Sequence, residues 1–294
     1  MPARPSGADA VKVPPQLLPL LEDGLIDAVV RPLRSGKEAA VFVVRCGEEL
    51  RCAKVYKDAQ QRGFRQAVAY QEGRKARNSR QMRAMEKRSR YGRREAETAW
   101  HSAEVDALYR LAAAGVRVPQ PYGLFDGVLL MELITDPAGD AAPRLGDLPL
   151  TAEEALDCHA RLLADVVRML CAGMVHGDLS EFNVLLTADG PVIIDLPQVV
   201  DATANNSARA LLERDVSNLG EYLGRYAPQL QGRAYGPEIW QLYAAGTLHP
   251  DSVLTGHIVA DTTPANVDDV MREIEAARLE AELRQAGREA AAQR

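Results

Sequence analysis

The sequence lacks an apolar run long enough to cross a membrane, and its N-terminus lacks the apolar core of a secretion signal. We therefore expect a cytoplasmic protein that engages no membrane. An excess of positive charge is also missing, since 35 Lys and Arg against 41 Asp and Glu give a net charge of −6. This modest acidity argues against a general nucleic-acid binder. With 47% hydrophobic and 26% charged residues, the composition is that of an ordinary globular protein.

Cysteine is scarce, and its spacing excludes two further classes of protein. No Cys-x-x-Cys pair occurs, and the four cysteines stand among apolar neighbours, at Cys46, Cys52, Cys158 and Cys171. Neither a zinc site nor a disulfide framework fits this pattern. We expect free, buried thiols in a reducing compartment.

Composition and periodicity divide the chain into three parts and predict the α+β class. Residues 1–20 begin with MPARPSGADA, which predicts a disordered leader. Residues 21–135 form a β-rich lobe, in which AAVFVV and ELRCAKVY predict one hairpin and GLFDGVLLMELI a second that turns at Asp126-Gly127. Residues 136–294 form a helical lobe, with a capping box at Thr151 and Glu154 and a helix end at Gly173. Later helices are expected at Ala210–Tyr226, at Glu238–Ala245 and from Pro264 onward.

The segment between the two hairpins, about residues 58–95, differs in composition from the rest and is predicted to be a flexible basic loop. Its basic residues are Arg74, Lys75, Arg77, Arg80, Arg83, Lys87, Arg88, Arg90, Arg93 and Arg94. Two interpretations stay open: a solvated, mobile loop, or a segment that contacts RNA or phosphate. The helix that follows ends at Gly115 and carries Glu104 on the same face as apolar residues, so Glu104 needs a cationic partner.

The stretch VHGDLSEFNVLL places polar side chains inside an apolar run, where they must be satisfied or cost free energy. Its His-x-Asp-x-x-x-x-Asn spacing is that of a kinase catalytic loop, and PVIIDLPQ puts Asp195 just past a strand, where the kinase Asp-Phe-Gly aspartate stands. We predict that Asp178 accepts the proton of an attacking hydroxyl, while Asn183 and Asp195 coordinate Mg²⁺. His176 and Asp215 are predicted to support the loop structurally.

The other parts needed for phosphoryl transfer from ATP stand upstream in the right order. Lys54 on a strand is predicted to reach the phosphates, with Glu104 as its ion-pair partner and Glu97 as the weaker choice. The stretch SGKEAAVF lacks both the Gly-x-Gly-x-x-Gly pattern and the full P-loop motif, yet its backbone N–H groups could cover the phosphates. The predicted ATP contacts in it are Ser35, Gly36, Lys37, Glu38, Ala39 and Val41.

These motifs together resemble the RIO family of atypical protein kinases. The resemblance rests on SGKEAAVF, CAKVYK, WHSAEVDALYRLAAAGVRVPQP, VLLMELI, HGDLSEFNVLL, IDLPQ and LERDVSNL, which span roughly Leu33 to Leu219. The short leader makes the chain similar to the subgroup without a winged-helix domain. The resemblance implies a trimmed, bilobal, protein-kinase-like fold with a β-rich N-lobe and a helical C-lobe.

The same resemblance implies the activity and the ligands. A RIO enzyme is a non-specific serine/threonine protein kinase that uses ATP with Mg²⁺ or Mn²⁺ and phosphorylates itself on serine. Family members are also associated with an ATPase cycle through a phosphorylated aspartate, which by motif position would be Asp195. The implied hinge for adenine comprises Met131, Glu132 and Ile134, with Leu133 between them. Family members with known biology act in maturation of the small ribosomal subunit, so a ribosomal particle or RNA is a possible partner through Arg74–Arg94.

Between Asp195 and the expected helix at Ala210 there is no Ala-Pro-Glu motif and little room for an activation segment. Because that segment ordinarily forms the platform for substrate peptides, we predict poor activity on generic peptides and only a few protein substrates.

Two alternative functions remain open. One is a small-molecule phosphotransferase of the aminoglycoside or choline kinase type, which shares the HGDL motif but usually has a larger C-terminal lobe. The other is an ATP-gated switch that binds RNA or a ribosomal particle through the basic segment. Both would use the same catalytic residues.

Overall fold

A computed structural model describes residues 13–36, 39–57 and 104–258 of the chain, and all of these except Ile258 belong to the compact unit Met1–His257. A five-stranded antiparallel sheet, in the order β1-β2-β3-β5-β4, forms the N-terminal part. Its strands are β1 (Ala28–Ser35), β2 (Ala39–Cys46), β3 (Glu49–Tyr56), β4 (Pro121–Phe125) and β5 (Val128–Glu132). Both predicted hairpins are present. The second turns at Asp126 (φ 46°) and Gly127 (φ 79°), since two consecutive positive φ angles match the right-handed twist of the strands.

The two faces of this sheet have different partners. Ala53 and Val55 on β3 pack with β5 and with two short helices, η1 (Pro15–Leu17) and α1 (Leu18–Glu22), whose Leu17 and Leu20 are buried. Side chains alternate along a strand, so Lys54 emerges on the opposite face, where the helix formed by residues 104–113 lies. This alternation directs Lys54 away from the apolar cluster under α1 and toward the candidate site.

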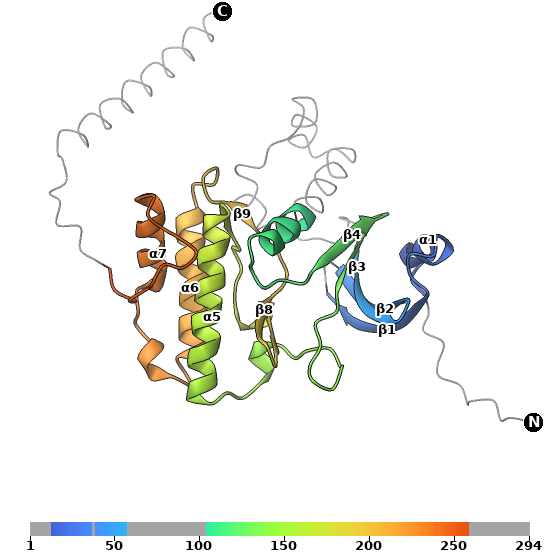
Figure 1. Ribbon diagram of the computed structural model, residues 1–294, viewed down its shortest axis with the longest axis horizontal. Coiled ribbons are helices and arrows are strands. Elements are labelled where there is room, and N and C mark those ends of the chain that lie inside the picture. The colour runs from blue at the N-terminus through green and yellow to red at the C-terminus, as the bar shows by residue number, and fades with distance from the viewer. Residues whose placement is uncertain (1–12, 37–38, 58–103, 259–294) are drawn as a thin grey trace, which may run out of the picture. The chain divides into compact units, whose positions relative to one another are not determined.

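The predicted leader extended too far along the chain. Residues 1–12 lie outside the described part, but η1 and α1 occupy residues 15–22 (Figure 1). Their leucines bury apolar surface against the sheet, which stabilises a segment whose Pro-rich start suggested disorder. The predicted basic loop and the helix expected from Pro264 lie outside the described residues.

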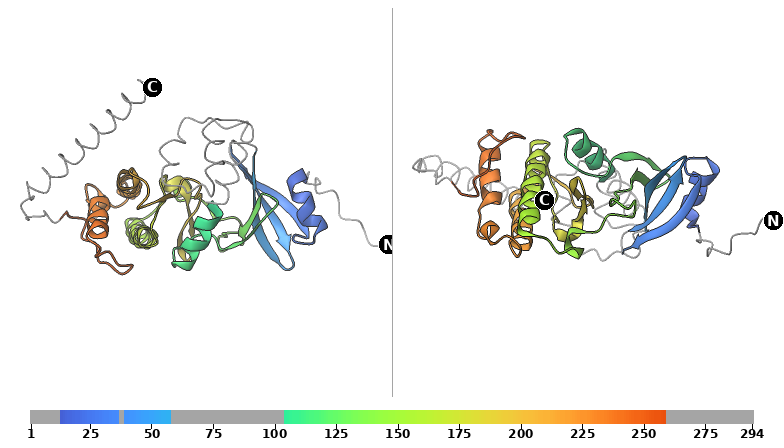
Figure 2. Two further views of the ribbon diagram at one scale, coloured as in Figure 1. Left: turned by 90° about the horizontal axis from the view of Figure 1, so that it is seen from above. Right: turned by 60° about the horizontal axis from the view of Figure 1, so that its bottom comes forward.

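The C-terminal part is mainly helical, as predicted. Its helices are η3 (Leu145–Asp147), α5 (Ala152–Cys171), η4 (Glu181–Asn183), α6 (Ala208–Leu223), η5 (Pro228–Leu230) and α7 (Tyr235–Ala244). Two small antiparallel pairs, β6 (Met174–Val175) with β9 (Val200–Asp201) and β7 (Val184–Thr187) with β8 (Gly190–Ile193), carry the loops of the site. Figures 1 and 2 show α5, α6 and α7 side by side.

Helix α5 begins with the predicted capping box. Thr151 Oγ1 accepts a hydrogen bond of 3.2 Å from the Glu154 N–H, and Glu154 Oε2 accepts one of 2.8 Å from the Thr151 N–H. The four cysteines are unpaired as expected, but Cys171, at the end of α5, is exposed rather than buried. Among the described helices, none combines the length and apolar character that crossing a bilayer requires.

Candidate active site

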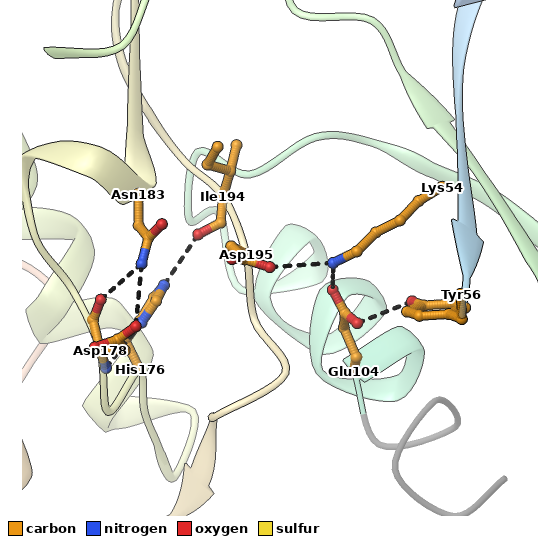
Figure 3. Close-up of polar contacts among 8 residues, drawn as sticks. All are labelled: Lys54, Tyr56, Glu104, His176, Asp178, Asn183, Ile194 and Asp195. Carbon is orange, nitrogen blue, oxygen red and sulfur yellow. Dashed lines mark hydrogen bonds and ion pairs between the residues drawn. The ribbon is translucent and has the colours of Figure 1, made fainter. Parts of the chain in front are cut away.

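Lys54 lies at the centre of the candidate site and contacts two carboxylates. Its Nζ donates to Glu104 Oε1 at 2.5 Å and to Asp195 Oδ1 at 3.1 Å (Figure 3). Glu104 is the first described residue of the helix over residues 104–113, and its Oε2 accepts a hydrogen bond of 2.9 Å from the Tyr56 hydroxyl. The cationic partner predicted for Glu104 is thus in place, whereas Glu97 lies outside the described residues.

The electrostatics of this cluster keep Lys54 and Asp195 charged. Burial opposes the charged form of Lys54, whose side chain is 11% exposed, but Glu104 and Asp195 outweigh this and raise the pKa of its ammonium. Burial likewise opposes the charge on Asp195, and the adjacent Lys54 outweighs it and lowers the pKa of that carboxyl. Burial, reinforced by Glu104, raises the pKa of Tyr56, so its hydroxyl stays a donor.

The catalytic-loop residues form a second group beside the first. Asn183, at the end of η4, donates from Nδ2 to the Asp178 backbone oxygen at 2.8 Å and faces Asp178 Oδ2 at 3.5 Å (Figure 3). Asn183 is buried, whereas Asp178 is exposed and open to a reacting group. The Asn183 carbonyl accepts a hydrogen bond of 3.0 Å from the Ile194 N–H, which ties this loop to the segment that carries Asp195.

His176 connects the two groups through its ring. Nδ1 lies 3.3 Å from the Asp178 N–H and accepts from it, so Nε2 carries the proton and donates to the Ile194 oxygen at 3.1 Å. Burial lowers the pKa of His176, which favours this neutral ring. These contacts suit the predicted structural role, because both ring nitrogens are occupied by backbone groups.

Asp215 on α6 holds the backbone of the same loop. Its two carboxylate oxygens accept from the Gly177 N–H at 2.7 Å and the Leu179 N–H at 3.0 Å. Two other residues of α6 bind the carbonyls of the same two loop residues: Arg214 donates to Gly177 O, and Asn218 donates to Leu179 O at 3.1 Å. Burial raises the pKa of Asp215 to about 7, against the effect of the two backbone donors.

The predicted phosphate loop is described only at its two ends. Lys57 at the end of β3 donates to the Gly36 carbonyl at 2.6 Å and to Ser35 Oγ at 2.9 Å. The Gly36 N–H donates to the Ala39 carbonyl at 2.9 Å, which closes the loop on itself. Val41 pairs with Lys54 across β2 and β3 and shares its face of the sheet. Lys37 and Glu38 lie outside the described residues.

The predicted hinge residues lie at the end of β5 and just beyond it. Several of their polar groups already have partners. The Glu132 N–H donates to Gln120 O at 2.8 Å, and the Ile134 carbonyl accepts from Ala142 N at 2.9 Å. The Glu132 carboxylate forms two 2.9 Å bonds with Arg117, so its side chain is occupied rather than free for a nucleotide. Met131 and Ile134 remain candidate adenine contacts, together with the backbone carbonyl of Glu132.

The donor chemistry of the site fits Mg²⁺. Asn183 uses Nδ2 on Asp178, and its amide oxygen points away from that residue (Figure 3). Asp195 leaves 47% of its side chain exposed, and a left-handed backbone (φ 67°) sets its direction. Within the described ranges, no three His, Cys, Asp or Glu side chains gather as a metal cage. Two oxygen donors suit Mg²⁺, which usually completes its shell with water and substrate phosphates.

Sequence reasoning missed five residues that support the site: Tyr56, Lys57, Arg117, Arg214 and Asn218. Tyr56 stands two residues after Lys54 and so shares its face of β3, a signal that was available in the sequence. Arg117 links the hinge to β8, because its side chain binds Glu132 and its carbonyl accepts from the Ile193 N–H at 2.9 Å. The roles of Arg117 and Lys57 depend on long-range contacts that no local pattern marks.

Comparison with known proteins gives a consistent result. The RIO domain family matches residues 40–234 of the chain. The RIO-type serine/threonine-protein kinase Rio1 of Haloferax volcanii is 34% identical over 218 residues, which cover 72% of this chain and 69% of the relative. The serine/threonine-protein kinase rio1 of Schizosaccharomyces pombe is 30% identical, over 71% of this chain but only 41% of the relative.

Solved structures agree on the fold. The Rio2 kinase of Chaetomium thermophilum, crystallised as an ADP/Mg²⁺-phosphoaspartate complex, matches with a TM-score of 0.51 at 20% identity, covering 71% of this chain and 59% of that one. At this identity the likeness concerns the fold alone. It confirms the predicted α+β, bilobal, kinase-like architecture.

Proposed function

This chain belongs to the RIO domain family, and from that premise we propose that it is an ATP- and Mg²⁺-dependent serine/threonine protein kinase that phosphorylates itself and a few protein partners. The observation that carries the proposal is the double ion pair of Lys54 with Glu104 and Asp195. A cation held between a helix carboxylate and a metal-binding carboxylate is the arrangement that an active protein kinase requires.

In the proposed reaction, Asp178 accepts the proton of the attacking serine hydroxyl, and its exposure leaves room for that substrate. Lys54 holds the phosphate chain, and Asp195 and Asn183 hold Mg²⁺, which neutralises charge on the phosphates when bound. His176 and Asp215 keep the loop backbone in place, so that the Asp178 carboxylate stays directed at the hydroxyl. Positioning of this kind, rather than covalent chemistry, supplies most of the rate in phosphoryl transfer.

A second activity is favoured by the geometry of Asp195. Its carboxylate remains 47% exposed on a left-handed backbone, and the Chaetomium Rio2 complex contains a phosphoaspartate. In this alternative, an Asp195 oxygen attacks the terminal phosphorus, ADP leaves, and water later releases phosphate from the acyl phosphate. The cycle would act as an ATP-gated switch, with Arg74–Arg94, which lie outside the described residues, as the RNA- or ribosome-binding segment.

Incubation with γ-labelled ATP and Mg²⁺ separates these activities. Acid-stable label on serine supports a protein kinase, whereas a hydroxylamine-labile adduct with free phosphate supports the aspartyl-phosphate switch. The Asp178→Ala variant serves as the control, because it should lose serine labelling in either case. A protein that yields none of these products would contradict both activities.

The partner of the switch can be tested separately. Replacing several arginines of Arg74–Arg94 with glutamine should abolish association with ribosomal particles and leave ATP hydrolysis intact. Association of the wild-type protein should weaken as salt is added, because phosphate contacts release counterions. Association that survives the replacement would contradict the RNA-binding proposal.

A further inference from the structure

Arg34 lies on the same face of the N-terminal sheet as Lys54. It is in register with Val41 on β2, and Val41 is in register with Lys54 on β3. Directly paired residues of antiparallel strands project to the same side, so the three side chains form one row across the sheet. Two strand spacings of about 4.8 Å place the Arg34 backbone about 10 Å from that of Lys54. An arginine side chain can cover much of that distance.

Arg144 approaches the same region from the C-terminal part. It forms an isolated antiparallel bridge with Leu185, and the Leu186 N–H donates to the neighbouring Pro143 carbonyl at 2.9 Å. This pairing holds Arg144 beside β7, two residues beyond Asn183. Arg144 is therefore attached to the strand that follows the candidate metal ligand.

The two arginines have like charge, and neither has an acidic side chain at ion-pair distance within the part of the chain that the structure describes. None of the ion pairs among the described residues involves either of them. Arg144 is half-buried; burial and the charge of Arg34 lower its pKa, while Asp195 and Asp147 act in the opposite direction. Because these carboxylates form no direct ion pair with either guanidinium, a bound anion would offset the repulsion between the two arginines.

We propose that Arg34 and Arg144 form a cationic subsite for the terminal phosphate of the nucleotide. The inference rests on the proposed ATP site. Lys54 is already engaged by two carboxylates, so its charge alone does not balance a triphosphate. Arg34 shares a face of the sheet with Lys54, and Arg144 lies beside the strand that follows Asn183. A terminal phosphate near a Mg²⁺ ion that Asp195 and Asn183 would hold is therefore within reach of two guanidinium forks, which bind phosphate oxygens in a bidentate manner. The subsite would distinguish ATP from ADP.

The test is a comparison of two affinities in the full chain. Dissociation constants are measured by calorimetry for ADP and for a non-hydrolysable ATP analogue, each with Mg²⁺, in wild type, Arg34→Gln and Arg144→Gln. Arg31→Gln is the matched control, because it removes the same charge from β1 at an exposed pair with Asp140. Arg144→Lys tests whether the fork itself matters, and circular dichroism checks folding.

We expect affinity for the ATP analogue to fall roughly 10- to 100-fold in Arg144→Gln, as for loss of a charge-assisted hydrogen bond, with ADP affinity changed less than about twofold. Arg34→Gln should behave similarly, Arg144→Lys should fall between, and Arg31→Gln should match wild type. The subsite is overturned if the ratio of the ADP and ATP-analogue dissociation constants stays as in wild type in both arginine variants, whether both affinities are unchanged or fall equally. A wild-type protein that binds neither nucleotide contradicts the proposed function itself, and the subsite with it.

Discussion

Each polar side chain of the candidate site has its direction set by another residue. Lys54 is held by Glu104 and Asp195, Glu104 by Tyr56, and Asn183 by the Asp178 backbone. Such mutual contacts keep each group close to one orientation, which lowers the entropy that substrate binding must otherwise remove. Asp178 is exposed and is the residue predicted to meet the hydroxyl of the substrate.

Substituting the two aspartates should separate chemistry from binding. We expect Asp178→Ala to lower autophosphorylation by about 10²- to 10⁴-fold while nucleotide affinity is largely kept, because a general base acts only in the transition state. Asp195→Ala should instead weaken Mg²⁺-dependent nucleotide binding, since it removes one of two oxygen donors. Kinase assays paired with calorimetry measure both effects. Serine phosphorylation retained in Asp178→Ala would exclude it as the base.

Tyr56→Phe tests the support of Glu104. Losing the 2.9 Å hydrogen bond should destabilise the fold by about 1 kcal/mol and reduce kcat/KM for ATP several-fold. Glu104→Gln should lower kcat/KM for ATP further than Tyr56→Phe does, because it removes the negative charge that pairs with Lys54. Urea unfolding and steady-state kinetics provide the two readouts. Equal activity of Tyr56→Phe and wild type would show that Lys54 alone orients Glu104.

At the scale of elements, α6 is the support on which the catalytic loop is built. Asp215 accepts two N–H groups of the loop, and Arg214 and Asn218 from the same helix bind two of its carbonyls. Helix α6 in turn packs against α5 and α7. The position of Asp178 therefore depends on a helix that begins thirty residues later in the chain (Figure 1).

Asp215→Asn should disturb this support without unfolding the protein. An amide oxygen can accept one of the two loop N–H groups, while its NH₂ faces the other donor. We expect kcat to fall at least about tenfold with little change in nucleotide affinity, because only the loop backbone is displaced. Glu221→Gln, an exposed change on the same helix, should leave kcat unaltered. Nucleotide affinity reduced as strongly as kcat would point to a wider structural role.

At the scale of the whole molecule, one large core joins the two parts that the structure describes. It runs from Ile239 on α7 to Leu129 and Tyr56 on the inner face of the sheet, and includes Leu108 from the helix between them. A smaller core lies under α1 on the outer face. Because the large core is shared, we expect the described part to unfold in one cooperative step.

His159, buried on α5, should make that step depend on pH. Burial lowers its pKa from 6.5 to about 4, so the ring is neutral in the folded protein but takes up a proton in the unfolded chain below about pH 6.5. The stability that it contributes is therefore present above pH 6.5 and is lost as the pH falls toward 4, by about 1.4 kcal/mol per pH unit.

Comparison with His159→Leu isolates this effect. The free energy of unfolding of wild type relative to the variant should fall by about 3 kcal/mol between pH 7 and pH 4, measured by urea titration. The raised pKa of Asp215 makes the free energy of unfolding rise as the pH falls through this range. This contribution is the same in wild type and variant, so it cancels in their difference. A pH-independent difference would mean that the ring is protonated in the folded protein too.

Nucleotide binding should also raise the stability of the whole molecule. Mg²⁺–ATP at about 100 times its Kd should add about 2.7 kcal/mol, seen as an increase in Tm by thermal scanning. Removal of Mg²⁺ with EDTA should reverse most of this gain, and Asp195→Ala should show little gain at all. A Tm that rises equally with and without Mg²⁺ would contradict the metal-binding role of Asp195.

The sequence alone determined the local features, because each of them follows from a short pattern. Alternation along two runs predicted the hairpins, Thr151 and Glu154 predicted the start of α5, and the spacing from His176 to Asn183 predicted the catalytic loop. The family resemblance then predicted the fold that the comparisons confirm. The choice of Glu104 as the partner of Lys54 needed only a carboxylate on an apolar helix face.

Tertiary structure decided what depends on residues far apart in the chain. The order of the residues does not reveal that Leu17 and Leu20 cover the sheet, that Arg117 occupies the Glu132 carboxylate, or that Arg144 pairs with Leu185 beside β7. Each of these results from contacts across lobes or strands, where packing and charge select among partners that local spacing leaves equivalent. The motifs were therefore enough to predict the candidate catalytic residues, while the residues that orient them were found only in the fold.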